Sequence, residues 1–202
     1  MTNVGRFLGA LILGVVFAGS ASAQNFIQLP ASGSGYYWYG DSFGHWGTPR
    51  LVYGMERAAA RWAREQPNAP RLGFGNMSLK KGGFYKGHET HRTGRDCDVR
   101  PVRNDGQEAP TQITAGTYHR DLTTLAISYC RQATSAYQVL FNDRQVQGTT
   151  WSKGHHNHFH VSVDGDGVVA NNGVTGAVSG ALGAAEGVGF VGNLERRRRR
   201  TR

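Results

Sequence analysis

Four of the eight histidines lie within six residues, 155–160, and the run Val161-Ser162-Val163 follows them directly. The β-branched run favours a strand, in which side chains two residues apart share a face. His158 and His160 are then expected on one face and Phe159 on the other. Two imidazoles on one face repel when charged, whereas two neutral imidazoles can bind one divalent cation. The segment therefore predicts a metal site on a strand, which a second segment must complete.

A second histidine cluster, residues 87–98, offers the missing ligands. His91 and Asp98 flank Gly94, a residue that permits a sharp turn from a loop into a strand. His91, Asp98 and one imidazole of the 158–160 run make a set of two histidines and one aspartate. Three protein ligands leave a fourth position for water, as in a catalytic rather than a structural zinc site.

The two ends of the chain differ in composition from its middle. Residues 1–23 combine Arg6, an apolar run too short to span a membrane and a small-residue site ending at Ala23, as in a cleavable signal peptide; a retained anchor is the alternative. Residues 165–202 are rich in Gly and Ala, have few large side chains and end in arginines, which predicts a disordered tail. These arginines either contact anionic envelope polymers or form a solvated charged end. Residues 24–164 remain as the folded domain.

Composition excludes several classes of protein. The 202 residues carry a net charge of +9 and a mean hydropathy of −0.46, which excludes a protein with several membrane spans. Two cysteines are too few for a disulfide-scaffold miniprotein. A basic exported domain fits an acidic envelope polymer as partner, and nucleic acid is not expected outside the cytoplasm.

The apolar pattern predicts an α+β fold. Thr48 and Pro49 mark the start of a helix that ends before Pro67, with its arginines pointing outward, and a second helix is expected over residues 121–132. We expect strands at residues 72–79, 95–102, 138–141 and 158–163. The order of these elements is mixed and shows no regular βαβ alternation.

The motifs at 82–98 and 155–161 resemble those of the penicillin-insensitive murein endopeptidases, and residues 45–52 look like that family's entry to its first helix. This family belongs to the LAS metallopeptidases, with lysostaphin-type enzymes, D-alanyl-D-alanine peptidases and the Sonic hedgehog signalling domain. The resemblance spans roughly residues 43–163. It implies a small central antiparallel sheet with flanking helices.

The resemblance also implies roles for individual residues. Residues that match His91, Asp98 and His160 hold Zn²⁺, the one that matches His158 assists catalysis beside the metal, and His155 matches a histidine that lines the site. No HExxH glutamate is present, so His158 is the first candidate for the catalytic base or for stabilising the oxyanion, and His155 is the second. The alternative for His158 is a residue that only orients a ligand.

The family pattern includes further possible metal-binding positions. His88 matches one further metal-binding position of the family, and Asp105 aligns with another. The family has a histidine where this chain has Glu108, so the second site is incomplete.

The activity implied is hydrolysis of the D-alanyl–diaminopimelyl cross-link of peptidoglycan by an exported enzyme, periplasmic or secreted. The alternatives are a D,D- or L,D-carboxypeptidase that trims stem peptides and a zinc-containing cell-wall-binding module without turnover. The free carboxylates of the substrate would suit Lys86, Arg92, Arg100 or Arg103, although a solvated face is the ordinary use of such residues.

Two side chains near the site have alternative roles. Asp96 shares a strand face with Asp98 and is either the carboxylate partner of a ligand histidine or a solvated residue. Cys97 faces the other way and, with Cys130, forms either a disulfide or two buried thiols. We expect the disulfide, because an exported chain meets oxidising conditions and a loop of about 34 residues gains roughly 3–4 kcal/mol.

Overall fold

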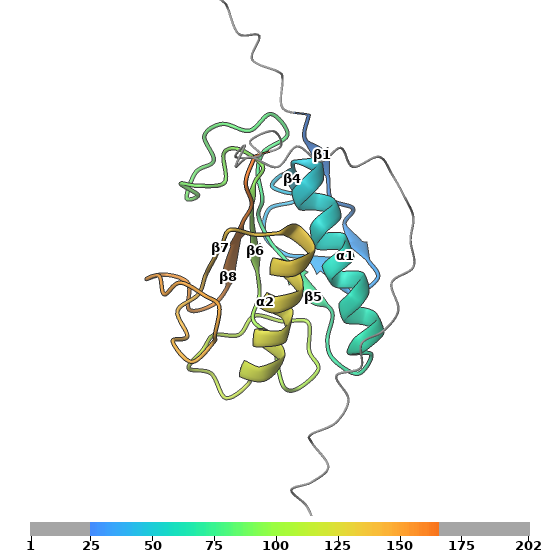
Figure 1. Cartoon of the computed structure of the whole chain (residues 1–202), viewed down its shortest axis with the longest axis vertical. Helices are drawn as coiled ribbons and strands as arrows, with labels where there is room; N and C mark the ends of the chain where they lie inside the picture. The colour runs from blue at the N-terminus through green and yellow to red at the C-terminus, as the bar shows by residue number, and fades with distance from the viewer. Residues whose placement is uncertain (1–24, 166–202) are drawn as a thin grey trace, which may run out of the picture. The chain divides into compact units, whose positions relative to one another are not determined.

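The computed structural model describes residues 25–165 (Figure 1). The expected signal peptide, residues 1–23, and the expected tail, apart from its first residue, lie outside the described residues. Within the described part, no helix combines the length and the apolar character that crossing a membrane requires.

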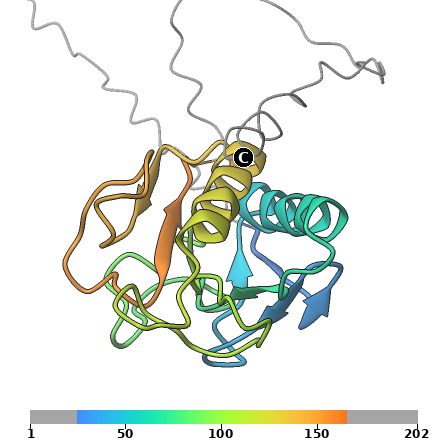
Figure 2. The same ribbon diagram turned by 90° about the horizontal axis from the view of Figure 1, so that it is seen from below.

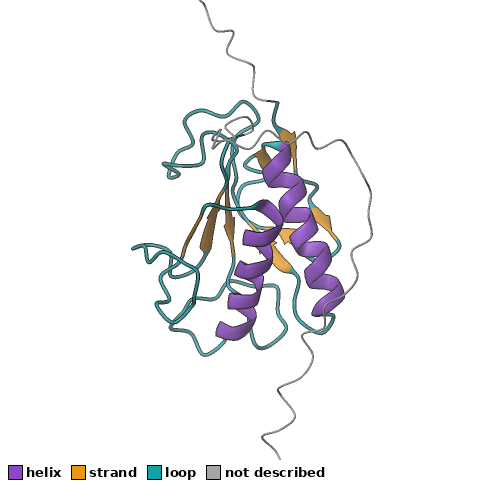
Figure 3. Ribbon diagram, in the orientation of Figure 1, coloured by secondary structure: helices purple, strands orange, loops and turns teal. Residues whose placement is uncertain are grey.

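The fold is α+β, as predicted, with two helices against a six-stranded sheet (Figure 3). The strand order in the sheet is β2-β3-β5-β6-β8-β7, and β1 and β4 form a separate pair. The strands are β1 (Ile27–Gln28), β2 (Ser32–Gly33), β3 (Tyr36–Trp38), β4 (Trp46–Gly47), β5 (Leu72–Phe74), β6 (Asp96–Val99), β7 (Gln138–Leu140) and β8 (Phe159–Ser162).

The expectation of an antiparallel sheet needs one correction. Every neighbouring pair of strands is antiparallel except β3 and β5, which run parallel. The cause is the connection between them, which contains the helix α1 (Pro49–Glu65). Such a helical crossover returns the chain to the edge from which it left, so the next strand points in the same direction.

Helix α1 begins where the sequence places it. The Thr48 side chain accepts a hydrogen bond from Leu51 N at 3.3 Å, and Pro49 occupies the first turn, where its missing N–H costs nothing. Buried Leu51, Met55 and Trp62 then recur at helical spacing and face the sheet and the second helix.

Helix α2 (Arg120–Thr134) lies beside α1, and both cover the same face of the sheet (Figure 2). The arginines of α1 were expected to point outward, and two of them also reach across to the end of α2. Arg50 and Arg57 donate to the carbonyls of Thr134 and Ala133 at 3.3 and 2.8 Å. They satisfy backbone groups at the negative end of the α2 dipole, so they hold the two helices together.

The expected disulfide is absent from the structure, where Cys97 and Cys130 are both free and buried. Cys97 lies on the helix-facing side of β6, in the same apolar core as Cys130. Burial raises the pKa of both thiols, that of Cys130 to about 12. The two cysteines therefore pack as small apolar side chains.

Candidate metal centre

The centre is built on the face of the sheet opposite the helices, where β6 and β8 pair. Their register places Asp98 directly opposite His160 and Asp96 opposite Ser162. Alternation turns these four side chains to one face, while Cys97 enters the core. The predicted shared face of Asp96 and Asp98 is therefore observed.

His91 reaches the centre from the loop before β6. Gly94 ends that loop with φ = 66°, and a Cβ atom there would lie 2.8 Å from the Phe26 ring and 3.1 Å from Gly47 Cα. The turn thus requires glycine. It brings His91 Nε2 to 3.3 Å from Asp98 Oδ1.

The hydrogen bonds of His91 fix which nitrogen faces the centre. His91 Nδ1 lies 2.8 Å from the carbonyl oxygen of Met77, to which it can only donate. In the neutral imidazole this leaves the lone pair on Nε2, the atom that faces Asp98. A metal-ligating histidine is held in this way.

His160 is held in the complementary way. Its Nδ1 lies 2.9 Å from Asp98 Oδ1, and its Nε2 donates to Asp96 Oδ1 at 3.1 Å. Asp96 is buried and also accepts from Ser162 Oγ at 2.7 Å. Asp96 is therefore the carboxylate partner of His160, not a solvated strand residue, and Nδ1 is the nitrogen left for a cation.

The pKa values of Asp98 and His160 favour a negatively charged Asp98 beside a positively charged His160. Burial alone would raise the pKa of Asp98, but the hydrogen bond from His160 outweighs burial and holds this pKa well below its usual range. Burial lowers the pKa of His160, yet the hydrogen bonds to Asp96 and Asp98 outweigh it and raise this pKa to about 9. In the protein alone a proton fills the position on His160 Nδ1, which a divalent cation would take over when it binds.

His88 lies near the other carboxylate oxygen of Asp98, with Nδ1 3.9 Å from Oδ2. A β-bulge prepares this approach, because Gly75 N donates to Asp98 O while Asp98 N donates to Asn76 O. Gly75 and Asn76 thus both lie opposite Asp98. This bulge ends β5 earlier than the predicted strand 72–79 and redirects the Asn76 side chain.

The Asn76 amide determines the role of His88. Asn76 Oδ1 accepts from the backbone N–H of Asp41 at 3.1 Å, so the group 3.0 Å from His88 Nε2 is the amide nitrogen, a donor. Nε2 must then carry the lone pair, and the proton of neutral His88 lies on Nδ1. The nitrogen that faces Asp98 is therefore a donor.

Two histidines thus compete for the third ligand position. His88, His91 and Asp98 form one group that could hold a metal, because their ligand atoms all lie within 4.8 Å of one another. The hydrogen bonds favour His160 over His88, because His160 can present a lone pair on Nδ1 whereas His88 presents a proton. The described residues therefore fit a cation held by two histidines and an aspartate.

His158 stands at the edge of this set. Its Nδ1 lies 2.8 Å from Asn157 Oδ1, to which it donates, and its Nε2 lies 3.7 Å from Asp98 Oδ1. Burial lowers the pKa of His158, and the neighbouring histidines add to this effect. His158 is therefore neutral at neutral pH and has a lone pair turned toward the centre.

His155 packs beside His158, with 4.8 Å between ring centres, and burial lowers its pKa as well. His156 is exposed. Asp105, in contrast, does not join the centre: this exposed residue forms an ion pair with Arg103 and lines neither cavity beside the site. His88 and Asp105 are thus not brought together as a second metal pair.

Two cavities adjoin at the centre and share Asp98, His88 and His158 in their walls. One has a volume of about 310 Å³ and is lined further by Glu89, Thr90, Leu140 and His155. The other, of about 500 Å³, is lined further by Tyr39, Asn76, Arg100 and Pro110. A chain molecule bound at Asp98 can therefore extend into both cavities.

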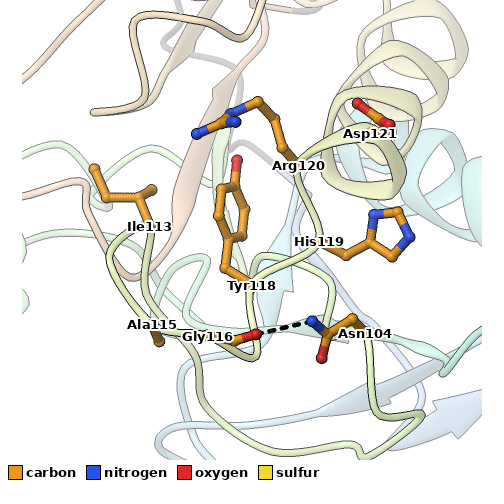
Figure 4. A pocket seen from close by; sticks show the side chains of 8 residues that line it. All are labelled: Asn104, Ile113, Ala115, Gly116, Tyr118, His119, Arg120 and Asp121. Carbon is orange, nitrogen blue, oxygen red and sulfur yellow. Dashed lines mark hydrogen bonds between the residues drawn. The ribbon is translucent and has the colours of Figure 1, made fainter.

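A third cavity, of about 480 Å³, lies at the N-terminal end of α2 (Figure 4). Three of its polar side chains already have partners: Arg120 and Tyr118 bind Asp143, and Asn104 donates to the carbonyl of Gly116. None of the histidines or aspartates of the metal centre lines it. The chemistry of the chain is concentrated at the other two cavities.

Sequence reasoning missed two of the groups that hold the histidines, Asn76 and the carbonyl of Met77. Both lie in the segment that was expected to be a plain strand, and no motif marks a β-bulge there. The nearest signal is Gly75, because an isolated glycine within a strand pattern often accompanies a bulge.

Comparison with known families gives one match. The sequence profile described as penicillin-insensitive murein endopeptidase matches residues 13–137, more than half of the chain. The matched range contains His91 and Asp98 and ends before His160. A comparison with curated proteins gives no match.

Proposed function

The chain belongs to the penicillin-insensitive murein endopeptidase family, and we propose that it is a zinc-dependent endopeptidase that hydrolyses the D-alanyl–diaminopimelyl cross-links of peptidoglycan. The observation that carries the proposal is the hydrogen bonding of the two ligand histidines. His91 and His160 each have one nitrogen held by a group other than Asp98, and the second nitrogen of each faces Asp98, where it can bind a cation.

Zinc would be held by His91 Nε2, a carboxylate oxygen of Asp98 and His160 Nδ1. When bound, the ion lowers the pKa of water and polarises the scissile carbonyl. Nitrogen and oxygen donors in this ratio suit Zn²⁺. A second zinc ion forms no part of the proposal.

His158 is the proposed catalytic base and acid. Its neutral Nε2 takes a proton from the attacking water and then gives it to the departing amine, while Asn157 keeps the proton of Nδ1 in place. His155 packs against the same ring and limits its movement. Neutral His88, whose Nδ1 proton faces the centre, can donate a hydrogen bond to the oxygen on which negative charge develops.

The two adjoining cavities favour an endopeptidase over a carboxypeptidase. A cross-link continues as peptide on both sides of the scissile amide, and two adjoining cavities that share Asp98 can receive the two continuations. A carboxypeptidase needs a closed wall close to the scissile bond. The lone pair of His158 argues against a module that only binds, because a structural zinc site has no use for it.

The proposed location follows from the substrate. Murein lies outside the cytoplasm, so we propose that residues 1–23 direct export to the periplasm or the exterior. For residues 165–202, we propose a contact between the terminal arginines and anionic envelope polymers.

Digestion of purified murein tests the proposal. We expect the protein to convert cross-linked muropeptide dimers into monomers, a chelator to stop the reaction and Zn²⁺ to restore it. Mass spectrometry of the products separates the alternatives, because a carboxypeptidase releases free D-alanine and leaves dimers intact. Dimers that stay intact with the zinc-loaded protein, without released amino acids, would refute an enzymatic function.

A further inference from the structure

Strand alternation places one positively charged side chain, that of Arg100, on the face that carries the metal centre. Asp96 and Asp98 project from β6 to this face, and Arg100 follows two residues later, just beyond the strand. The backbone is still paired there, because Arg100 N donates to the Gly73 carbonyl at 3.0 Å. At about 3.3 Å per residue, the backbone of Arg100 lies roughly 7 Å from that of Asp98.

The side chain of Arg100 is held at the wall of the larger cavity. Its guanidinium carbon lies 4.2 Å from the centre of the Tyr39 ring, and its Nη1 donates to Tyr37 Oη at 3.3 Å. Gly73 leaves room for this arrangement, since a Cβ atom there would lie 3.1 Å from Arg100 Cδ. The guanidinium plane is thus fixed by an aromatic face and a phenol.

The charge of Arg100 has no partner within residues 25–165. The ion pairs of these residues involve Arg61, Arg64, Arg71, Arg103 and Arg120, but not Arg100. The hydrogen bond to Tyr37 uses only part of its donor capacity. Arg100 can therefore bind an anion with a carboxylate's planar geometry.

The other basic side chains that could bind a substrate carboxylate are less well placed than Arg100. Arg103 already binds Asp105 and the carbonyl of Pro110, and neither Lys86 nor Arg92 lines a cavity of the centre. Among the described residues, no lysine or arginine lines the smaller cavity, which contains Glu89 instead. The two sides of the centre thus differ in charge.

We propose that Arg100 binds a free carboxylate of the substrate on the leaving-amine side of the scissile amide. In a D-alanyl–diaminopimelyl cross-link, the carbon that bears the scissile nitrogen also bears a carboxylate, so the anion lies close to the reacting bond. The charge difference then sets the direction of binding: the diaminopimelyl side occupies the larger cavity and the D-alanyl side the smaller one. This inference rests on the proposed function and adds the recognition of one substrate group.

The test compares two muropeptide dimers, one with this carboxylate free and one with it amidated. We expect Arg100→Gln to raise KM for the free dimer about 10- to 100-fold, as for a lost charge-assisted hydrogen bond, with little change in kcat. For the amidated dimer, wild type and variant should agree within about twofold. Arg100→Lys should restore part of the loss, and the matched control Arg103→Gln should leave KM unchanged.

Equilibrium binding separates a failure of this inference from a failure of the proposed function. In the zinc-loaded His158→Ala background, Arg100→Gln should weaken binding of the free dimer by the same factor, whether or not turnover occurs. If Arg100→Gln affects the free and the amidated dimer equally, or neither, the assignment of Arg100 is wrong even where wild type cleaves murein. Wild type that binds neither dimer would overturn both proposals.

Discussion

Replacing Asp96 by asparagine tests whether the partner of His160 helps to hold the metal. Asp96 is 6% exposed, accepts from His160 Nε2 at 3.1 Å and Ser162 Oγ at 2.7 Å, and touches no other histidine of the centre. Asn has the same shape and can keep one accepting oxygen, so the change removes mainly the negative charge. That charge makes His160 Nδ1 a stronger donor to a cation.

The expected loss follows from this position. Carboxylate partners of ligand histidines contribute about 10- to 100-fold in metal affinity, or roughly 1.4–2.7 kcal/mol. A competition titration of Zn²⁺ against a chromophoric chelator measures the loss for Asp96→Asn. Asp105→Asn is the matched control, because this aspartate is exposed and its partners, Arg103 and the backbone N–H of Gln107, lie in its own loop. Equal zinc affinities for wild type and Asp96→Asn would refute the reasoning.

Three further predictions concern other groups. His158→Ala should keep the metal, as elemental analysis would show, and lose about 10²- to 10⁴-fold in kcat; loss of the metal instead would make His158 a ligand. His45 is fully buried and stacks on Trp38, and burial lowers its pKa despite nearby Asp41. In the unfolded chain His45 is protonated as the pH falls below about 6.5, whereas in the folded chain it stays neutral to lower pH. The free energy of unfolding should therefore fall as pH drops from about 6.5 to 5. Urea titrations should show a shallower fall for His45→Gln, and an equal fall would contradict this cause. Cys97 and Cys130 should resist alkylation in the native protein and both react in denaturant without reductant; no reaction there would reveal a disulfide.

The parts of the fold that sequence predicted depend on local signals. Thr48 and Pro49 fix the start of α1 because the cap and the proline act within one turn. The shared face of Asp96 and Asp98 follows from the geometry of a strand, whatever its neighbours. The contact between His160 and Asp98 could be expected because the strand that carries His160 has too few ligands to hold a metal by itself.

The parts that sequence did not predict depend on distant contacts. The parallel pairing of β3 with β5 is set by how α1 packs, and the placement of Arg57 by the end of a helix more than 70 residues away. The proton on His88 Nδ1 depends on Asn76, whose own amide is oriented by the backbone of Asp41. Such chains of hydrogen bonds leave no periodic trace in a sequence.

Counting the metal in two histidine variants tests the centre most directly. Elemental analysis of the purified protein after dialysis against Zn²⁺ should give about one equivalent for wild type and for His88→Ala, and none for His160→Ala, because of these two histidines only His160 can turn a lone pair toward Asp98. Zinc retained by His160→Ala and lost from His88→Ala would contradict the assignment of the ligands. Wild type that takes up no zinc would contradict the metal centre itself.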